Sequence, residues 1–518
     1  MATPVATGVS AREAPPPLAR GPLLVAALAF LAIEMAVATR YGWFRDEFYY
    51  LACADHLAAG YVDQPPLSIW VLAGWRAVFG ESLAMLRLLP ALLGALTVFL
   101  TGVLAWRLGG GRIGQVIAAI AAFTAPVVLG TFHVVSMNSF DLLLWLAAFL
   151  ALTRALGSDG TLDWLGLGVV LGLGLLDKIS VLWLLAGIGA GIVLTEPRRL
   201  ARPGPWLAAA VALALFAPHA FWQLENHWPT LEFMRNATGE KMVATSPAAF
   251  WEGQLSSMNP ANVLVWLPGL AWLVLDRDGR RWRAFAIVFV VVALILMSGG
   301  RSRASYLAPA YLALFAAGGV ALERWLRGGW RAWARAATVT VVVACGAVIA
   351  PFALPLLPVG RFIAYQRRLG MAPRTEERHR MGPLPQHYAD MFGWPELVDA
   401  VAKAWATLTP DERAHAAIFG QNYGEAGAIQ VLGRSRGLRP VLSGHNNYWL
   451  WPPSGDVRVL IIVGGDEADN RAFFGRLDRV GEWDHGLAMP YERHTPLWIG
   501  RDPKRDLRTA WGLVKQFI

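Results

Sequence analysis

Long apolar runs separated by short polar connectors fill the first two-thirds of the chain. About 20 apolar residues are needed for a helix to cross the hydrocarbon core of a bilayer. Eleven runs of about this length or slightly less predict membrane-spanning helices at residues 21–39, 86–106, 113–131, 138–155, 163–177, 179–195, 205–222, 258–275, 283–298, 304–324 and 335–357. The pattern therefore predicts a polytopic, mainly helical membrane domain over residues 21–358, preceded by a disordered tail of residues 1–20.

Arginine alternates with these runs in a regular way. If the N-terminus is cytoplasmic, every connector on the cytoplasmic side contains arginine, as the positive-inside rule expects. These arginines are Arg107, Arg112, Arg154, Arg198, Arg199, Arg202, Arg277, Arg280, Arg281, Arg283, Arg324, Arg327, Arg331 and Arg335. An odd number of spans then places the C-terminal region on the non-cytoplasmic side. The expected location is the plasma (inner) membrane.

The pattern changes near residue 359, where long apolar runs give way to short ones with turns and mixed charge. Residues 394–408 have the apolar spacing of a helix. Short strands are expected at 416–420, 439–443 and 457–465. Strands that alternate with helical stretches indicate a small α/β domain, here over residues 359–518 and outside the membrane.

Composition agrees with this division. Of the 518 residues, 55% are hydrophobic and 16% are charged, against about 25% charged in an average soluble domain. The net charge of +9 comes in clusters between the apolar runs, which indicates membrane topology and not nucleic-acid binding. Two distant cysteines, Cys53 and Cys345, form neither a disulfide framework nor a metal motif.

The first outward connector, residues 40–85, has an unusual concentration of polar groups. It contains the acidic pair Asp46 and Glu47, and a Pro-Pro pair that should start a juxtamembrane helix of about 14 residues, too short to span. Ionisable groups at membrane depth are costly and usually functional. The acidic pair has three interpretations: a base that accepts a proton from an attacking acceptor, a metal ligand, or a cap on the juxtamembrane helix. Arg45 is an ion-pair partner, a phosphate contact or a headgroup charge.

The run RDEFYYLACADHLAAGYVDQPPL, which starts at Arg45, resembles the first-loop signature of glycosyltransferase family 39. This family comprises protein O-mannosyltransferases and aminoarabinose transferases of the PMT_2 type with the GT-C fold. The resemblance implies transfer of a sugar from a polyprenyl-phosphate donor with inversion, Asp46 as the catalytic base and Glu47 as its neighbour. It requires no cofactor, and a divalent metal is compatible with it but not indicated. The sequence departs from the family at Asp63-Gln64, where many relatives have a basic residue.

Two further polar positions lie at the outer ends of predicted spans. Asp141, in SMNSFDLLLW with Asn138, matches a second acidic residue that the resemblance assigns to supporting the acceptor or the donor. The alternative is a polar residue that marks the interface. Lys178, after LGLGLLD, either extends to the headgroups or, as the resemblance implies, neutralises the lipid phosphate.

Two later outer segments add candidates. In residues 218–241, the contacts to sugar or phosphate are expected from His219, Trp222, Asn226, His227 and Arg235, although a structural role is the alternative for each. The turn at residues 299–305 carries Arg301 and Arg303 outside, against the charge rule, which indicates a bound anion. The resemblance implies that these arginines and Tyr306 face the donor phosphate.

The sequence thus predicts a GT-C-type bundle of about 11 transmembrane helices with a C-terminal non-cytoplasmic α/β domain. Its function would be transfer of a sugar from a lipid-linked donor to a glycan, lipid or protein acceptor outside the cytoplasm. No catalytic role is expected for Tyr423, His445 or Trp449 of the outer domain, whose aromatic rings are interpreted as packing. The alternatives are a transporter or flippase of lipid-linked sugars and an inactive binding subunit.

Overall fold

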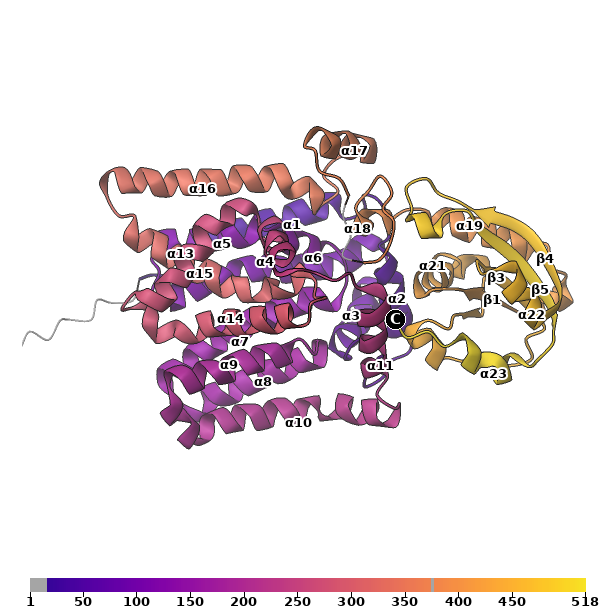
Figure 1. Ribbon diagram of the computed structural model, residues 1–518, viewed down its shortest axis with the longest axis horizontal. Coiled ribbons are helices and arrows are strands. Elements are labelled where there is room, and N and C mark those ends of the chain that lie inside the picture. The colour runs from indigo at the N-terminus through magenta and orange to yellow at the C-terminus, as the bar shows by residue number, and fades with distance from the viewer. Residues whose placement is uncertain (1–15, 374–376) are drawn as a thin grey trace, which may run out of the picture.

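The computed structural model describes residues 16–373 and 377–518. Figure 1 shows a long bundle of helices with a smaller α/β domain at one end. Most of the predicted tail, residues 1–15, lies outside the described residues. The chain that follows packs on the bundle, because the Pro16 carbonyl accepts a hydrogen bond from the Trp106 indole at 2.7 Å. The helix α1 then begins at Arg20.

The apolar runs form helices in the predicted order. Within the described residues, seven helices are long and apolar enough to cross a membrane when the 3-10 turns that adjoin three of them are included. They are α1 (Arg20–Val37), α4 (Leu83–Arg107), α7 (Met137–Ser158), α10 (Pro203–Glu225), α14 (Arg283–Ser298), α15 (Ala308–Trp325) and α16 (Gly329–Ile349). The count is nine if two bent pairs each form one span.

The bent pairs and two short helices account for the other predicted runs. The helices α5 (Arg112–Phe123) and α6 (Pro126–His133) meet at 62°, and α12 (Pro247–Ser257) and α13 (Val263–Leu275) are bent by 99°. The helices α8 (Thr161–Asp177) and α9 (Val181–Thr195) have 17 and 15 residues. Prolines open α6 and the turn before α13, where a missing N–H and a fixed φ favour a new helix start.

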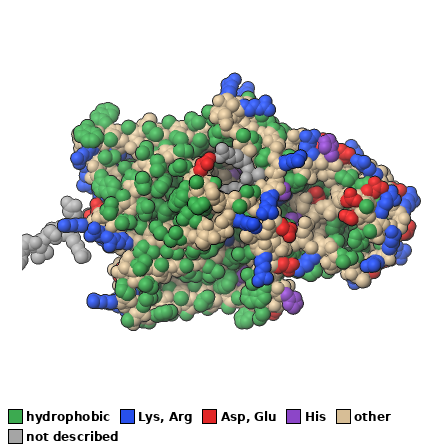
Figure 2. Space-filling view, in the orientation of Figure 1, with side chains coloured by type: hydrophobic (Ala, Val, Ile, Leu, Met, Phe, Trp, Pro, Cys, Tyr) green, Lys and Arg blue, Asp and Glu red, His purple; other side chains and the backbone are tan. Residues whose placement is uncertain are grey.

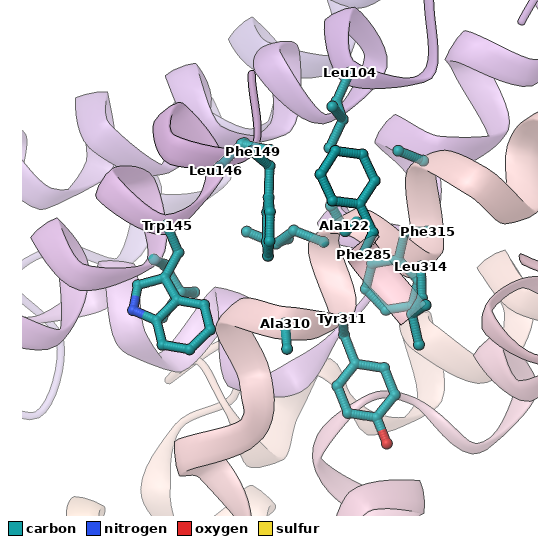
Figure 3. Packing of buried hydrophobic residues seen from close by; sticks show 14 of the residues in the cluster. Leu104, Ala122, Trp145, Leu146, Phe149, Phe285, Ala310, Tyr311, Leu314 and Phe315 are labelled. Atoms are coloured by element: carbon teal, nitrogen blue, oxygen red, sulfur yellow. The ribbon is translucent and has the colours of Figure 1, made fainter. Parts of the chain in front are cut away.

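The core of the bundle surrounds α15, in which every residue from Ala308 to Glu323 is buried. In Figure 3, aromatic side chains from α7, α14 and α15 converge, and the rings of Phe149 and Phe285 lie 5.3 Å apart. Two glycines of α15 allow close helix crossings, since a Cβ on Gly318 would lie 2.0 Å from the Val265 carbonyl oxygen and one on Gly319 would lie 2.1 Å from that of Gly114. Small residues at crossings are typical of membrane helix packing.

The surface of the bundle matches a membrane domain. Figure 2 shows hydrophobic side chains across its visible face, with Lys and Arg gathered at the end far from the α/β domain. Two connectors that were predicted to be cytoplasmic meet there, since Arg324 donates a hydrogen bond to the Gly109 carbonyl at 3.3 Å. The prediction of a polytopic, mainly helical fold is confirmed.

The C-terminal domain is a five-stranded sheet with helices. We call it the outer domain after its predicted location on the non-cytoplasmic side. Its strands are β1 (Ala416–Gly420), β2 (Val441–Leu442), β3 (Val459–Val463), β4 (Phe474–Trp483) and β5 (Thr495–Pro503). They lie in the order β2-β1-β3-β5-β4. The strand β1 pairs in parallel with β2 and β3, and β5 pairs antiparallel with both β3 and β4. The three predicted strands and the helix α19 (Trp394–Ala406) are present, whereas β4 and β5 were not predicted.

The remaining helices connect the two parts or lie in the outer domain. They are α2 (Arg45–Asp55), α3 (Leu67–Phe79), α11 (Pro229–Asn236), α17 (Val359–Arg368), α18 (Gln386–Ala389), α20 (Pro410–Ala414), α21 (Tyr423–Leu432), α22 (Glu467–Phe473) and α23 (Leu507–Ala510). The predicted juxtamembrane helix is α3, which begins directly after the Pro-Pro pair. The helix α2 before it was not predicted, and it carries the acidic pair into the interface with the outer domain.

Candidate active site

The two adjacent acids of α2 face different surroundings. Glu47 is 1% exposed, and its carboxylate accepts hydrogen bonds from Arg87, at 2.9 Å from Nε and 2.8 Å from Nη2. Its Oε2 also accepts from the backbone N–H of Phe44 at 2.9 Å, which caps the first turn of α2. The acidic pair was also interpreted as a cap on the juxtamembrane helix α3, but Glu47 caps α2, the helix to which it belongs. This carboxylate is fully engaged with the bundle.

Asp46 faces a cavity of about 650 Å³. Its side chain is 36% exposed, and Oδ1 accepts a hydrogen bond of 2.9 Å from the hydroxyl of Tyr423. One wall of the cavity is formed by the starts of α2 and α21. The other walls come from α12 and the segment before it, from the turn before α15, and from residues 377–390. A carboxylate that remains partly exposed in such a cavity can meet a substrate.

The helix α21 lies against α2 because two glycines allow a close approach. A Cβ on Gly424 would lie 2.3 Å from Cγ of Arg45, and one on Gly427 would lie 2.7 Å from Cβ of Phe48. The side chain of Asn422 accepts hydrogen bonds from the first two N–H groups that follow Tyr423, at 2.9 and 3.0 Å. This cap fixes the first turn of α21, so the outer domain supplies Tyr423 to the cavity. This place in the cavity differs from the expectation that the ring of Tyr423 only packs.

Two cations line the cavity beside Asp46. Arg303, from the turn before α15, forms an ion pair with Glu377, and Lys241 lies 3.6 Å from the same carboxylate. Burial lowers the pKa of Lys241. Burial alone would raise the pKa of Glu377, but Lys241 and Arg303 outweigh it and hold that pKa below its usual value. Lys241 was not singled out from the sequence, although it ends the polar segment 218–241.

Arg45 connects the cavity to a group of buried acids. It donates hydrogen bonds to the hydroxyls of Tyr491 at 2.6 Å and Tyr423 at 3.3 Å, and it lies 3.7 Å from Glu492. Burial raises the pKa of Glu492 to about 8 and that of Asp390 to about 6, against the opposing effect of Arg45. Of the three interpretations of Arg45, this geometry favours the ion-pair partner.

Four other predicted residues form a second cluster. The Lys178 ammonium donates to Asn138 Oδ1 at 2.7 Å and to Asp141 Oδ2 at 3.2 Å, and it lies 5.3 Å from the ring centroid of Tyr306. Ser180 donates to the other oxygen of Asp141 at 3.0 Å. In the described part of the chain, these four predicted residues are not among those that line the cavity at Asp46. The single predicted site is therefore two adjoining groups.

Five further predicted residues make local contacts, and their binding to sugar or phosphate stays a prediction. Nδ1 of His219 lies 3.2 Å from the Ala59 carbonyl, and the ring of Trp222 stacks on His219, so both hold the first outer loop. The Asn226 amide donates to the Trp222 carbonyl at 2.9 Å. His227 is exposed and has a positive φ in the turn before α11. Arg301 donates to the Thr238 carbonyl at 2.7 Å. Within the described ranges, none of these five lines the cavity.

A protein metal site needs several His, Cys, Asp or Glu side chains close together. Within residues 16–373 and 377–518, no group of three or more His, Cys, Asp or Glu side chains is arranged to hold a metal ion. The Lys and Arg side chains that line the cavity are those of Arg45, Lys241 and Arg303.

Comparison with known proteins bears on the family. Residues 63–222 match the family model described as dolichyl-phosphate-mannose-protein mannosyltransferase. The predicted family resemblance is confirmed. The lipopolysaccharide core galacturonosyltransferase RgtB of Rhizobium johnstonii is 27% identical over 51% of this chain and 52% of its own length. An undecaprenyl phosphate-alpha-4-amino-4-deoxy-L-arabinose arabinosyl transferase of Pseudomonas savastanoi is 26% identical over 49% of this chain and 50% of its own length.

Solved structures share the fold. ArnT from Cupriavidus metallidurans bound to undecaprenyl phosphate superimposes with a TM-score of 0.58 at 15% sequence identity. The superposition covers 92% of this chain and 97% of the ArnT chain. The apo form of the same protein gives a TM-score of 0.60. The chain therefore has the GT-C architecture, while the matched sequence spans about half the length of the curated relatives.

Proposed function

We propose that the protein is an integral membrane glycosyltransferase that takes a sugar from a polyprenyl-phosphate donor. The observation that carries this proposal is the cavity in which the partly exposed carboxylate of Asp46 lies with Arg303 and Lys241. A carboxylate can accept a proton, and the two cations can hold a phosphate. Such a combination suits displacement of a lipid phosphate by an acceptor hydroxyl or amine.

In the proposed reaction, Asp46 accepts the proton of the acceptor as the acceptor atom attacks the anomeric carbon. The bond between that carbon and the phosphate oxygen breaks, and the lipid phosphate leaves with the electron pair. Inversion at the anomeric carbon follows from a single displacement. Arg303 and Lys241, now paired with Glu377, would stabilise the charge that grows on the phosphate.

The second cluster has a supporting place in this proposal. Lys178, Asp141, Asn138 and Tyr306 adjoin the cavity through Ser305, the neighbour of Tyr306 that lines it. Because none of these four described side chains lines the cavity at Asp46, we assign this group to shaping the donor side of the site. We assign the first contact with the phosphate to Arg303 and Lys241.

The membrane orientation belongs to the same proposal. The arginine-rich connectors would face the cytoplasm, so that the cavity and the C-terminal domain lie on the non-cytoplasmic side of the inner membrane. The two curated relatives named above are a lipopolysaccharide core galacturonosyltransferase and an undecaprenyl-phosphate sugar transferase. This favours an enzyme over a transporter or flippase of lipid-linked sugars.

The test is turnover by the purified protein in vesicles. The donors would be undecaprenyl phosphates that carry labelled mannose, 4-amino-4-deoxy-arabinose or galacturonic acid. Lipopolysaccharide in the vesicles would be the acceptor, and release of undecaprenyl phosphate would be the readout. Asp46→Asn should lower the rate by about 10²–10⁴-fold, the usual contribution of a general base. The control is Asp399→Asn, an exposed carboxylate paired with Arg436 on the outer domain. Equal rates in wild type and Asp46→Asn, or movement of intact donor across the vesicle without turnover, would contradict the proposal.

A further inference from the structure

The hydroxyl of Tyr423 lies between a cation and the carboxylate of Asp46. Arg45 Nη2 is 3.3 Å from the hydroxyl oxygen, and that oxygen is 2.9 Å from Asp46 Oδ1. A guanidinium has donors only, so Arg45 must use a lone pair of the hydroxyl. The single hydroxyl proton is then directed at Asp46. The order of donation, from Arg45 to Tyr423 to Asp46, is thereby fixed.

We propose that Tyr423 is a positioning residue that the C-terminal domain supplies to Asp46, and that its hydroxyl orients the carboxylate and holds it ionised for proton abstraction. This role rests on the proposed function, in which Asp46 is the base. It gives the outer domain a part in the reaction, because the bundle alone does not contain the group that donates to Asp46 Oδ1. The side chain of Asp46 keeps its 36% exposure toward the cavity.

The ring of Tyr423 is held on several sides, so its hydroxyl has little freedom to move. The Tyr49 ring lies 4.7 Å away between centroids, the His445 ring lies 4.7 Å away, and the Arg45 guanidinium sits 5.2 Å from the Tyr423 centroid. Tyr423 is 7% exposed. A donor that is fixed before the substrate arrives costs no reorganisation during the reaction.

A hydrogen bond donated to a carboxylate favours its ionised form. Other charges also act on Asp46, and a pH test must account for them. The cations at the cavity are Arg45, Lys241 and Arg303. The other titratable side chains that face it or act on it are Glu252, Glu377, His387 and Asp390 in the cavity wall, and Asp63 and Tyr50 close by. Replacement of Tyr423 by phenylalanine keeps all of these groups and removes the hydroxyl, which donates to Asp46 and accepts from Arg45.

The experiment compares Tyr423→Phe with Tyr448→Phe in the full-length protein in vesicles. Tyr448 is the matched control, since it is a buried tyrosine of the same domain whose hydroxyl donates to Gln430 at 2.8 Å, away from the cavity. For Tyr423→Phe, kcat should fall about tenfold, the usual size of the effect for one hydrogen bond to a charged group, while the donor KM changes less than twofold. The acid limb of the rate profile should move up by about one pH unit. Tyr448→Phe should leave kcat, KM and the acid limb as in wild type.

The outcomes separate this proposal from the proposed function. An active wild type whose Tyr423→Phe variant has the same kcat and acid limb would overturn the role of Tyr423 and leave the function standing. So would a fall in kcat with no shift of the acid limb, because a purely structural loss would produce it. In the double variant with Asp46→Asn, Tyr423→Phe should cause no further loss, and additive losses would overturn the proposal. A wild type inactive on every donor would overturn the proposed function and this role with it.

Discussion

The two sides of α2 differ in how their charges are satisfied. On the bundle side, Glu47 and Arg87 are each 1% exposed and share two hydrogen bonds, and Arg87 also donates to the Ala38 and Gly42 carbonyls at 2.7 and 2.9 Å. On the outer side, Asp46 opens into the cavity, and Arg45 lies among buried acids whose pKa values are raised. Adjacent residues of one turn thus have opposite environments.

The difference shows how a structural charge can be told from a functional one. Removal of a charge from water is costly, and it is tolerated when hydrogen bonds and an opposite charge replace the lost water. Glu47 meets this condition and has no capacity left for a substrate. Asp46 keeps an exposed face, and the strongly perturbed groups beside it are of the kind that gathers at functional sites. Sequence adjacency alone cannot make this distinction.

The largest effect that would test this comparison is on stability and comes from Glu47→Gln. The substitution removes the negative charge that compensates Arg87, which stays buried. Loss of one partner of a buried pair typically costs about 3–5 kcal/mol. Thermal unfolding in detergent should show a clear fall in Tm and yield for Glu47→Gln, with Asp46→Asn close to wild type. Similar Tm values for the two variants would remove the distinction between the two sides of α2.

Much of the bundle was predictable because it depends on local features of the chain. Apolar runs determine where helices form in a membrane, and arginine connectors separate them. The bends were harder to predict from the sequence. The turn at Pro260, for example, lies within the continuous apolar run 258–275. In the outer domain, β4 was missed because six of its ten residues are exposed and its buried positions, Phe474, Leu477 and Trp483, do not alternate along the strand.

The site was predicted only in part. Asp46 and Arg303 are recognisable because they are polar residues in unusual places next to apolar runs. Tyr423 is 377 positions from Asp46, and only the folding of the outer domain onto α2 brings the two together. Lys178 and Asp141 were expected to face the same ligand as Asp46. In the structure they form an ion pair with each other, because a lysine and an acid that are both nearly buried each need a partner, and their contact with a ligand stays a prediction.

A smaller effect on stability should distinguish the second cluster, in which Lys178 pairs with Asp141, from the cavity at Asp46. In Lys178→Met, the Asp141 carboxylate, whose side chain is 3% exposed, loses a charged hydrogen-bond donor. The expected loss of stability is about 2 kcal/mol, in the range for hydrogen bonds to charged groups. The matched variant is Lys241→Met in the cavity, where the same change should mainly weaken donor binding. Thermal unfolding and the donor KM would be measured for both. A larger rise in KM for Lys178→Met than for Lys241→Met would place the phosphate at the second cluster.

The smallest effect, measured per pH unit, concerns the buried acids beside Arg45. Burial raises the pKa of Glu492 from 4.5 to about 8, so the folded state holds its proton more tightly than the unfolded state. The resulting stabilisation is complete below pH 4.5 and is lost as the pH rises through about 8. Glutamine cannot ionise, so Glu492→Gln should flatten the fall in Tm between pH 5 and 8. Between the two pKa values, the stability that Glu492 contributes should fall by about 1.4 kcal/mol per pH unit, because the folded state then holds one proton that the unfolded state has lost. Asp390, whose pKa is raised to about 6, keeps its own contribution in both proteins. An unchanged Tm profile would mean that Glu492 is ionised in the folded protein throughout this range, and that the outer side of α2 is as fully paired as the side that faces Arg87.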